Sequence, residues 1–233
     1  MISEHDADAT AHYRSTRRDL LDLLARQPAD HLDLPVPACP DWRVRDVVAH
    51  LVGIAADLNA GRIPGPDDDG DAWTARQVEA RAGATLAELA EEWERESGPF
   101  EAGLDLFGYA MGSHFLGDLL QHASDIRAAL DLERVADDLT LDIAFDFYAD
   151  AAHESLVADA DGAVTMVLGQ ERLTIGPDVA VAELTTDRFE AFRLLGGRRS
   201  EAQIRALSWT GDVDRVVRRL SRYPLPVTDL VDP

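Results

Sequence analysis

The sequence predicts an α+β protein in two parts, an N-terminal four-helix bundle followed by a smaller α+β domain. Apolar residues recur at helical spacing through most of the chain up to Leu130, whereas strand-like segments appear only after residue 162. Helices followed by mixed strands and helices are typical of two separately packed domains. The character of the sequence changes between Asp131 and Asp138. We therefore place the domains at residues 1–134 and 135–233.

The first two helices of the bundle are predicted from apolar periodicity and from the residues that flank it. One helix is expected over about 8–26, stopping before a proline. A proline-containing loop follows, and Asp41 stands where the N-cap of the second helix belongs. That helix is expected over 44–58, where apolar residues recur at helical spacing. Residues 61–70, with two prolines and three successive aspartates, are expected as a surface loop.

The third and fourth helices complete the predicted bundle. Thr85 is the expected N-cap of the third helix, whose apolar residues include Leu89 and Trp93, and Gly98-Pro99 is expected to end it. The fourth helix is expected from about Phe107 to Leu130. Four amphipathic helices joined by short to moderate loops favour an antiparallel bundle, and the core of such a bundle is a common place for metal sites.

The second domain is predicted to combine a small sheet with short helices. A hairpin is indicated by two β-rich runs separated by a short turn containing glycine. The expected elements are a helix over 139–155, strands over 163–168, 172–175 and 179–184, a helix over 186–195 ending at Gly196-Gly197, a strand over 206–209 and a helix over 212–220.

Composition excludes several classes of function. The formal charge of −22 argues against a nucleic-acid partner, because phosphate would be repelled. No apolar run is long enough to span a bilayer and the N-terminus does not resemble a signal peptide, so we expect a cytoplasmic protein without a membrane partner. Cys39 is the single cysteine, which excludes an intrachain disulfide and an all-thiolate metal site. The chain has no lysine, which excludes Schiff-base chemistry and a P-loop.

Histidines and aspartates on two predicted helices form a candidate metal site. His114, Asp118, His122 and Asp125 are spaced four, four and three residues apart on the fourth helix, which places them near one face. His50 lies on the apolar face of the second helix. Three nitrogen or oxygen ligands with an open coordination position are typical of a catalytic metal centre.

Spacing alone leaves the ligand set open. Asp118 could act with His114 or with His122, and Asp125 is placed as an outer acceptor or a surface group. The alternative without a metal is a buried ion pair between Asp118 and His122 or an arginine.

Two motifs on these helices resemble a known family. The segment from Pro40 to Leu51, a tryptophan-containing turn leading into a helix that ends in His-Leu, resembles the signature of the mycothiol-dependent maleylpyruvate isomerase family, within the broader DinB-like superfamily. The run His122-Ala123-Ser124-Asp125-Ile126 is similar to the family's His-x-x-Asp. Residues 194–198 and 209–212 are similar to the family's smaller domain, which resembles sterol carrier protein folds.

The resemblance implies a divalent metal, usually zinc, held by His50, Asp118 and His122, with His114 left as a pocket or core residue. Aspartate at 118 departs from the isomerase pattern, which has glutamate there. The resemblance also implies mycothiol as a thiol cofactor and a small electrophile as substrate. Arg198, in the Gly-Gly-Arg-Arg turn, matches a family motif, and we assign it the catalytic role of holding an acidic substrate.

The function implied by this resemblance is a metal- and mycothiol-dependent isomerase or S-transferase. A metal ion would lower the pKa of a thiol bound at its open position. The alternatives are a metal- or small-molecule-binding protein without catalysis, which the aspartate at 118 motivates, and a metal-dependent hydrolase.

Overall fold

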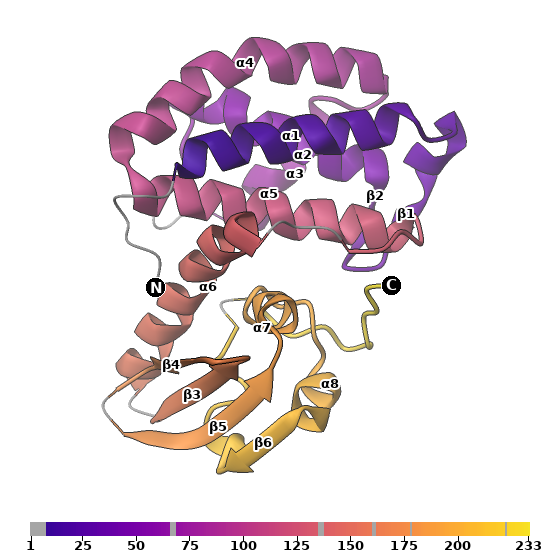
Figure 1. Ribbon diagram of the computed structural model, residues 1–233. Helices are drawn as coiled ribbons and strands as arrows, with labels where there is room; N and C mark the ends of the chain where they lie inside the picture. The colour runs from indigo at the N-terminus through magenta and orange to yellow at the C-terminus, as the bar shows by residue number, and fades with distance from the viewer. Residues whose placement is uncertain (1–7, 66–68, 135–137, 160–161, 178, 222) are drawn as a thin grey trace. The chain divides into compact units, whose positions relative to one another are not determined.

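The computed structural model describes residues 8–65, 69–134, 138–159, 162–177, 179–221 and 223–233 (Figure 1). These residues divide into two compact units. The helical unit contains residues 8–115, 122–134 and the last two residues, and the mixed unit contains 116–121 together with the described residues from 138 to 231. The predicted domain boundary falls beside residues 135–137, which lie outside the described ranges, so it stays a prediction.

Helices build most of the helical unit. Its elements are α1 (Ala9–Ala25), a 3₁₀ turn (Ala29–Asp33), β1 (Pro35–Val36), β2 (Cys39–Arg43), α2 (Val44–Asn59), α3 (Gly70–Glu79), α4 (Leu86–Phe107) and α5 (Tyr109–Ala129), with the middle of α5 grouped with the mixed unit. α2 packs against both α3 and α4, and α1 packs against α4. Fully buried Trp93 of α4 is the largest side chain of this core.

Local hydrogen bonds explain where these helices begin. At the start of α4 the Thr85 hydroxyl accepts from the Glu88 backbone N–H at 3.2 Å, and the Glu88 carboxylate accepts from the Thr85 N–H at 2.8 Å. This capping box satisfies two amide groups that a helix N-terminus leaves unpaired. The prediction that Thr85 caps the helix is confirmed.

The predicted N-cap of the second helix is wrong. Asp41 lies in β2, and Arg43 is the N-cap of α2. The Asp46 carboxylate accepts from the Arg43 backbone N–H at 2.8 Å. β2 therefore continues to the first residue of the helix, because pairing with β1 holds the chain extended as far as Arg43.

The predicted end of the third helix at Gly98-Pro99 is also wrong. α4 continues through Pro99 to Phe107, although proline removes one backbone donor from the helix. Phe100 and Leu104 keep the apolar stripe buried beyond the proline, with 3% and 2% of their surface exposed. Glu101 also binds Arg14 of α1 at 2.7 Å. These contacts stabilise the part of α4 that follows Pro99.

A four-stranded sheet organises the mixed unit. Its elements are α6 (Asp138–Asp159), β3 (Ala163–Leu168), β4 (Glu171–Ile175), β5 (Ala180–Thr186), α7 (Arg188–Leu195), α8 (Glu201–Ala206), β6 (Ser208–Gly211) and a 3₁₀ turn (Val213–Arg215). The strand order is β4-β3-β5-β6, with β3 and β5 parallel and the other pairs antiparallel. α6 packs against β3, β4 and α7.

The chain crosses one end of β3 between β4 and β5. Gly176 lies in this crossing with φ +103°, and a Cβ atom there would stand 2.9 Å from the Ala163 Cα. Glycine is therefore required by both the backbone angle and the close approach.

The predicted hairpin, third strand and following helix are confirmed, and the α+β class with a helical N-terminal region and a small mixed sheet holds. Two details of the C-terminal prediction are wrong. The segment 212–220 forms only a 3₁₀ turn, and α8 occupies residues where no helix was expected. Among the residues described, no helix combines the length and apolar character that crossing a bilayer requires.

Candidate metal centre

α2 and α5 bring the three predicted ligands together. One donor atom from each of His50, Asp118 and His122 lies within 4.8 Å of the other two. Asp118 and His122 are one turn apart on α5, so their side chains share a face. The two histidines are buried and the aspartate is half-buried. The side chains are thus positioned to share one ion, and their binding of a metal stays a prediction.

The His50 ring is held from α3. Its Nδ1 atom lies 2.8 Å from the Gln77 Oε1 atom, and both residues are buried. The ring of Trp42, from β2, has its centroid 5.1 Å from that of His50. A metal-binding histidine commonly uses its second ring nitrogen to bind an acceptor of this kind, which fixes the ring's orientation.

The His122 ring has an acceptor on its own helix. Its Nδ1 atom lies 3.4 Å from the Asp125 Oδ2 atom, and Asp125 is fully buried. The contact has the distance of an ion pair and not the geometry of a hydrogen bond, so the outer-acceptor role that the sequence suggested for Asp125 stays a prediction. Both candidate histidine ligands therefore have Nδ1 near an acceptor oxygen.

A second possible group shares one of these histidines. Donor atoms of Cys39, His122 and Asp125 also lie within 4.8 Å of one another. The Cys39 thiol donates to the Asp125 Oδ2 atom at a donor–acceptor distance of 3.9 Å. We favour the group that contains His50, because its three residues are the ones that the family resemblance implies as ligands.

His114 is in neither of the two groups found among the described residues. Its ring stacks on that of Phe115, with the centroids 4.8 Å apart and the planes 12° from parallel. The pocket or core role that the resemblance implied for His114 stays a prediction.

Arg198 lies in the mixed unit, just after α7. Its Nη1 atom donates to the Gly196 carbonyl at 2.9 Å, and its side chain is half-buried. Two neighbouring arginines are bound within the same unit. Arg193 donates to the Gln121 Oε1 atom at 2.6 Å, and Arg199 forms two hydrogen bonds to the Glu190 carboxylate. The catalytic role of Arg198 stays a prediction.

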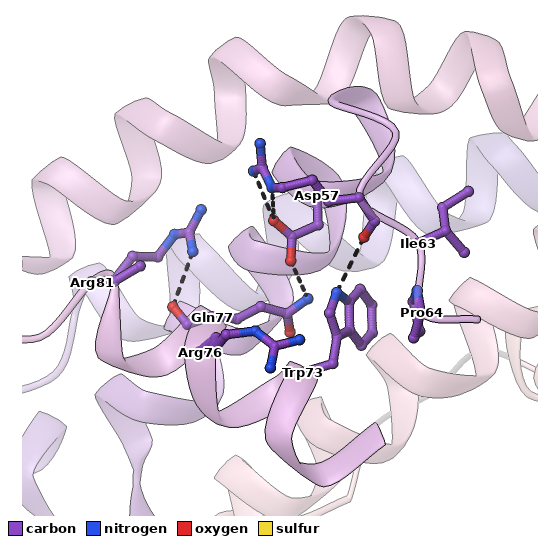
Figure 2. A pocket seen from close by; sticks show the side chains of 9 residues that line it. Asp57, Ile63, Pro64, Trp73, Arg76, Gln77 and Arg81 are labelled. Atoms are coloured by element: carbon purple, nitrogen blue, oxygen red, sulfur yellow. Dashed lines mark hydrogen bonds and ion pairs between the residues drawn. The ribbon is translucent and has the colours of Figure 1, made fainter. Parts of the chain in front are cut away.

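Sequence reasoning missed Gln77 and its partner Asp57. The Gln77 Nε2 atom donates to the Asp57 Oδ2 atom at 3.0 Å, and both residues line a hollow of about 480 Å³ beside α3 (Figure 2). One signal could have located them. Gly53 lies between His50 and Asp57 on α2, and a Cβ atom there would stand 2.4 Å from the Gln77 Cβ. A glycine inside a helical pattern indicates close packing of another element.

Comparison with known proteins agrees with this architecture. Residues 13–107 match the family described as the mycothiol maleylpyruvate isomerase N-terminal domain. None of the curated proteins matches the chain.

Two solved structures resemble the fold. The crystal structure of the mycothiol-dependent maleylpyruvate isomerase aligns with a TM-score of 0.54 and 12% identity, covering 85% of this chain and 92% of that one. A histidine-to-alanine mutant of that isomerase aligns with a TM-score of 0.53 and 11% identity, covering 84% and 92%. At this identity the likeness shows the fold alone. The α1–α4 region, residues 13–107, thus belongs to the family of mycothiol maleylpyruvate isomerase N-terminal domains.

Proposed function

We propose that this protein binds a divalent metal, with zinc as the expected ion, and uses mycothiol either to isomerise a small electrophile or to transfer the thiol sulfur to it. His50, Asp118 and His122 are the proposed ligands, and their convergence within 4.8 Å is the observation that carries the proposal. The family of the N-terminal region and the fold of the solved isomerase support the choice of cofactor and reaction.

The donor set suits a catalytic metal rather than a structural one. Two imidazoles and one carboxylate leave a tetrahedral ion with one open position. Such a metal, when bound, lowers the pKa of a thiol at that position so that the thiol becomes a nucleophile near neutral pH. Among these donors the His50 ring is held by its contact with Gln77.

Aspartate at position 118 is compatible with this role. Its side chain is one methylene shorter than the glutamate of the isomerase pattern, yet a carboxylate oxygen still lies within 4.8 Å of a donor atom of each histidine. The shorter side chain is compatible with ligation because His50 and His122 are themselves close, with ring centroids 5.2 Å apart.

Two further points belong to the proposal. The helical unit is proposed to be a DinB-like bundle, and the mixed unit to correspond to the smaller, sterol-carrier-like domain. Arg198 is proposed to bind the carboxylate of an acidic substrate, because a guanidinium can hold a carboxylate through two parallel hydrogen bonds.

Metal analysis and one activity assay test the proposal. The purified protein is expected to contain about one zinc ion per chain. In the presence of mycothiol it should isomerise maleylpyruvate or form a thioether with a model alkylating agent, as detected by mass spectrometry. His50→Ala should lose the metal, whereas His114→Ala, the matched control, should keep it.

Each other result has a definite meaning. No stoichiometric metal in the wild-type protein would refute the proposal. Metal retention in His50→Ala would refute the ligand set. Turnover of an ester or amide without mycothiol would favour the hydrolase, and bound metal without any turnover would favour a binding protein.

A further inference from the structure

We propose that Gln77, oriented by Asp57, fixes the tautomer of His50 and is a positioning residue for the metal centre. The effect on metal binding rests on the function proposed above. The tautomer itself is a property of the metal-free protein and can be measured without an ion.

The orientation of the Gln77 amide follows from its partner on α2. A carboxylate only accepts hydrogen bonds, so the amide must turn its NH₂ group toward Asp57. The Gln77 Nε2 atom lies 3.0 Å from the Asp57 Oδ2 atom. The opposite end of the same amide, Oε1, must then face His50, where it lies 2.8 Å from Nδ1.

The orientation of the amide determines where the His50 proton resides. An amide oxygen cannot donate, so the hydrogen bond to Gln77 requires a proton on His50 Nδ1. In the neutral ring the lone pair is then on Nε2. A metal can bind only through that lone pair, so the network selects the tautomer that a metal requires. The opposite tautomer would place two lone pairs against each other inside the core.

Charged neighbours hold this arrangement in position. Arg62 binds the Asp57 Oδ1 atom through both Nε, at 2.8 Å, and Nη2, at 2.7 Å, while the other carboxylate oxygen, Oδ2, accepts from Gln77. Arg81 donates to the Gln77 backbone carbonyl at 3.0 Å and binds the Glu92 carboxylate through two hydrogen bonds.

Burial adds to this restraint. Only 2% of the Gln77 surface is exposed, so breaking its hydrogen bonds would leave buried polar atoms without partners. Gly53 lets α3 come close enough for the contact, as described above. Hydrogen bonds therefore restrain the side-chain amide and the backbone carbonyl of Gln77, and close packing against α2 restrains its Cβ atom.

The expected effect on metal binding follows from the usual role of such partners. Loss of a hydrogen-bond partner behind a metal-binding histidine lowers metal affinity by about 10- to 100-fold. We expect Gln77→Met, which keeps the length of the side chain and removes its polar atoms, to lower zinc affinity within that range.

Nitrogen-15 NMR of the histidine rings in the metal-free protein tests the tautomer directly. The spectra are recorded at about pH 8, where an ordinary histidine is neutral. The wild-type protein should show His50 with its proton on Nδ1 alone. Gln77→Met should shift His50 toward the Nε2–H form.

Asp57→Asn provides a variant of unchanged shape. Because an asparagine can also donate, the Gln77 amide can turn over, and both His50 tautomers should appear. Arg62→Gln is the matched control: it removes the ion pair to Asp57 but leaves the carboxylate, so His50 should keep the wild-type tautomer.

The outcomes separate this inference from the proposed function. His50 with its proton on Nε2 in the wild-type protein, or an unchanged tautomer in both Gln77→Met and Asp57→Asn, would overturn the inference. A wild-type protein that binds no zinc would instead remove the metal assignment, while the NMR result would still decide the tautomer. A changed tautomer with zinc affinity reduced less than about threefold would refute the positioning role for the metal, since that lies below the expected range.

Discussion

Gly53→Ala should destabilise the protein, although alanine is the better helix former. Glycine in a helix interior is less favourable than alanine by about 1 kcal/mol, so a substitution in open space would stabilise α2. At position 53 the added Cβ would stand 2.4 Å from the Gln77 Cβ and 2.7 Å from its Cγ. Both distances are shorter than van der Waals contact, so α3 must move away from α2.

The magnitude follows from two costs and one gain. Overpacking of this kind costs about 1–3 kcal/mol. Displacing Gln77 also weakens its 2.8 Å hydrogen bond to His50, at about 1 kcal/mol. After the gain in helix propensity, the expected decrease in the free energy of unfolding is about 1–3 kcal/mol.

Urea denaturation of the purified variants measures this change. Gly103→Ala in α4 is the matched control, because no atom lies within 4 Å of the added Cβ. The control should be more stable than wild type by about 0.5–1 kcal/mol. If Gly53→Ala is stabilised as much as the control, the close approach of α2 and α3 is not present in solution.

Three other variants test separate parts of the structure. Asp118→Glu should keep zinc. Asp118→Asn should lower zinc affinity, measured by competition with a chelator, by more than the roughly 100-fold that loss of an outer hydrogen-bond partner costs. Full zinc affinity in the asparagine variant would remove Asp118 from the ligand set. Cys39→Ser should leave the zinc content unchanged, and loss of zinc on this substitution would move the site to the group of Cys39, His122 and Asp125. Hydrogen bonds from the backbone N–H and the hydroxyl of Thr85 lower the pKa of Glu88 below its ordinary value of 4.5. The ionised Glu88 carboxylate therefore stabilises the folded state fully above pH 4.5, and this stabilisation is lost as the pH falls through the lowered pKa. The difference in unfolding free energy between wild type and Glu88→Gln should therefore shrink on acidification, and a difference that does not vary with pH would contradict the capping box.

Local signals made much of the fold predictable. The capping residues at Thr85, the apolar stripes of α1, α2 and α5, and the alternating strands of the hairpin each act within a few residues of the chain. The sequence of α3 contains no apolar stripe that would predict a helix, because the residue that this helix buries is the polar Gln77. Pro99 predicts a helix end that does not occur, since the packing of the residues beyond it outweighs the lost hydrogen bond.

The candidate site was predictable only in part for the same reason. The spacing of Asp118 and His122 is local to one helix, and His50 stands in a motif that a family resemblance identifies. The orientation of the His50 ring depends on a residue 27 positions away in another helix. Nothing in the sequence around His50 specifies that contact, apart from the glycine that permits it.

The strand order of the mixed unit has a consequence for the folding route. β3 and β4 pair through residues close in the sequence. The chain that follows β4 must first cross one end of β3, and only then can β5 pair with the edge of β3 opposite β4. Contacts between near neighbours form faster than contacts that first require a longer loop to close. We therefore expect the hairpin to form first and to serve as the template along whose open edge β5 assembles. A bulkier residue at Gly176 would obstruct this second event, because its Cβ atom would stand 2.9 Å from the Ala163 Cα of β3, while the hairpin could still form.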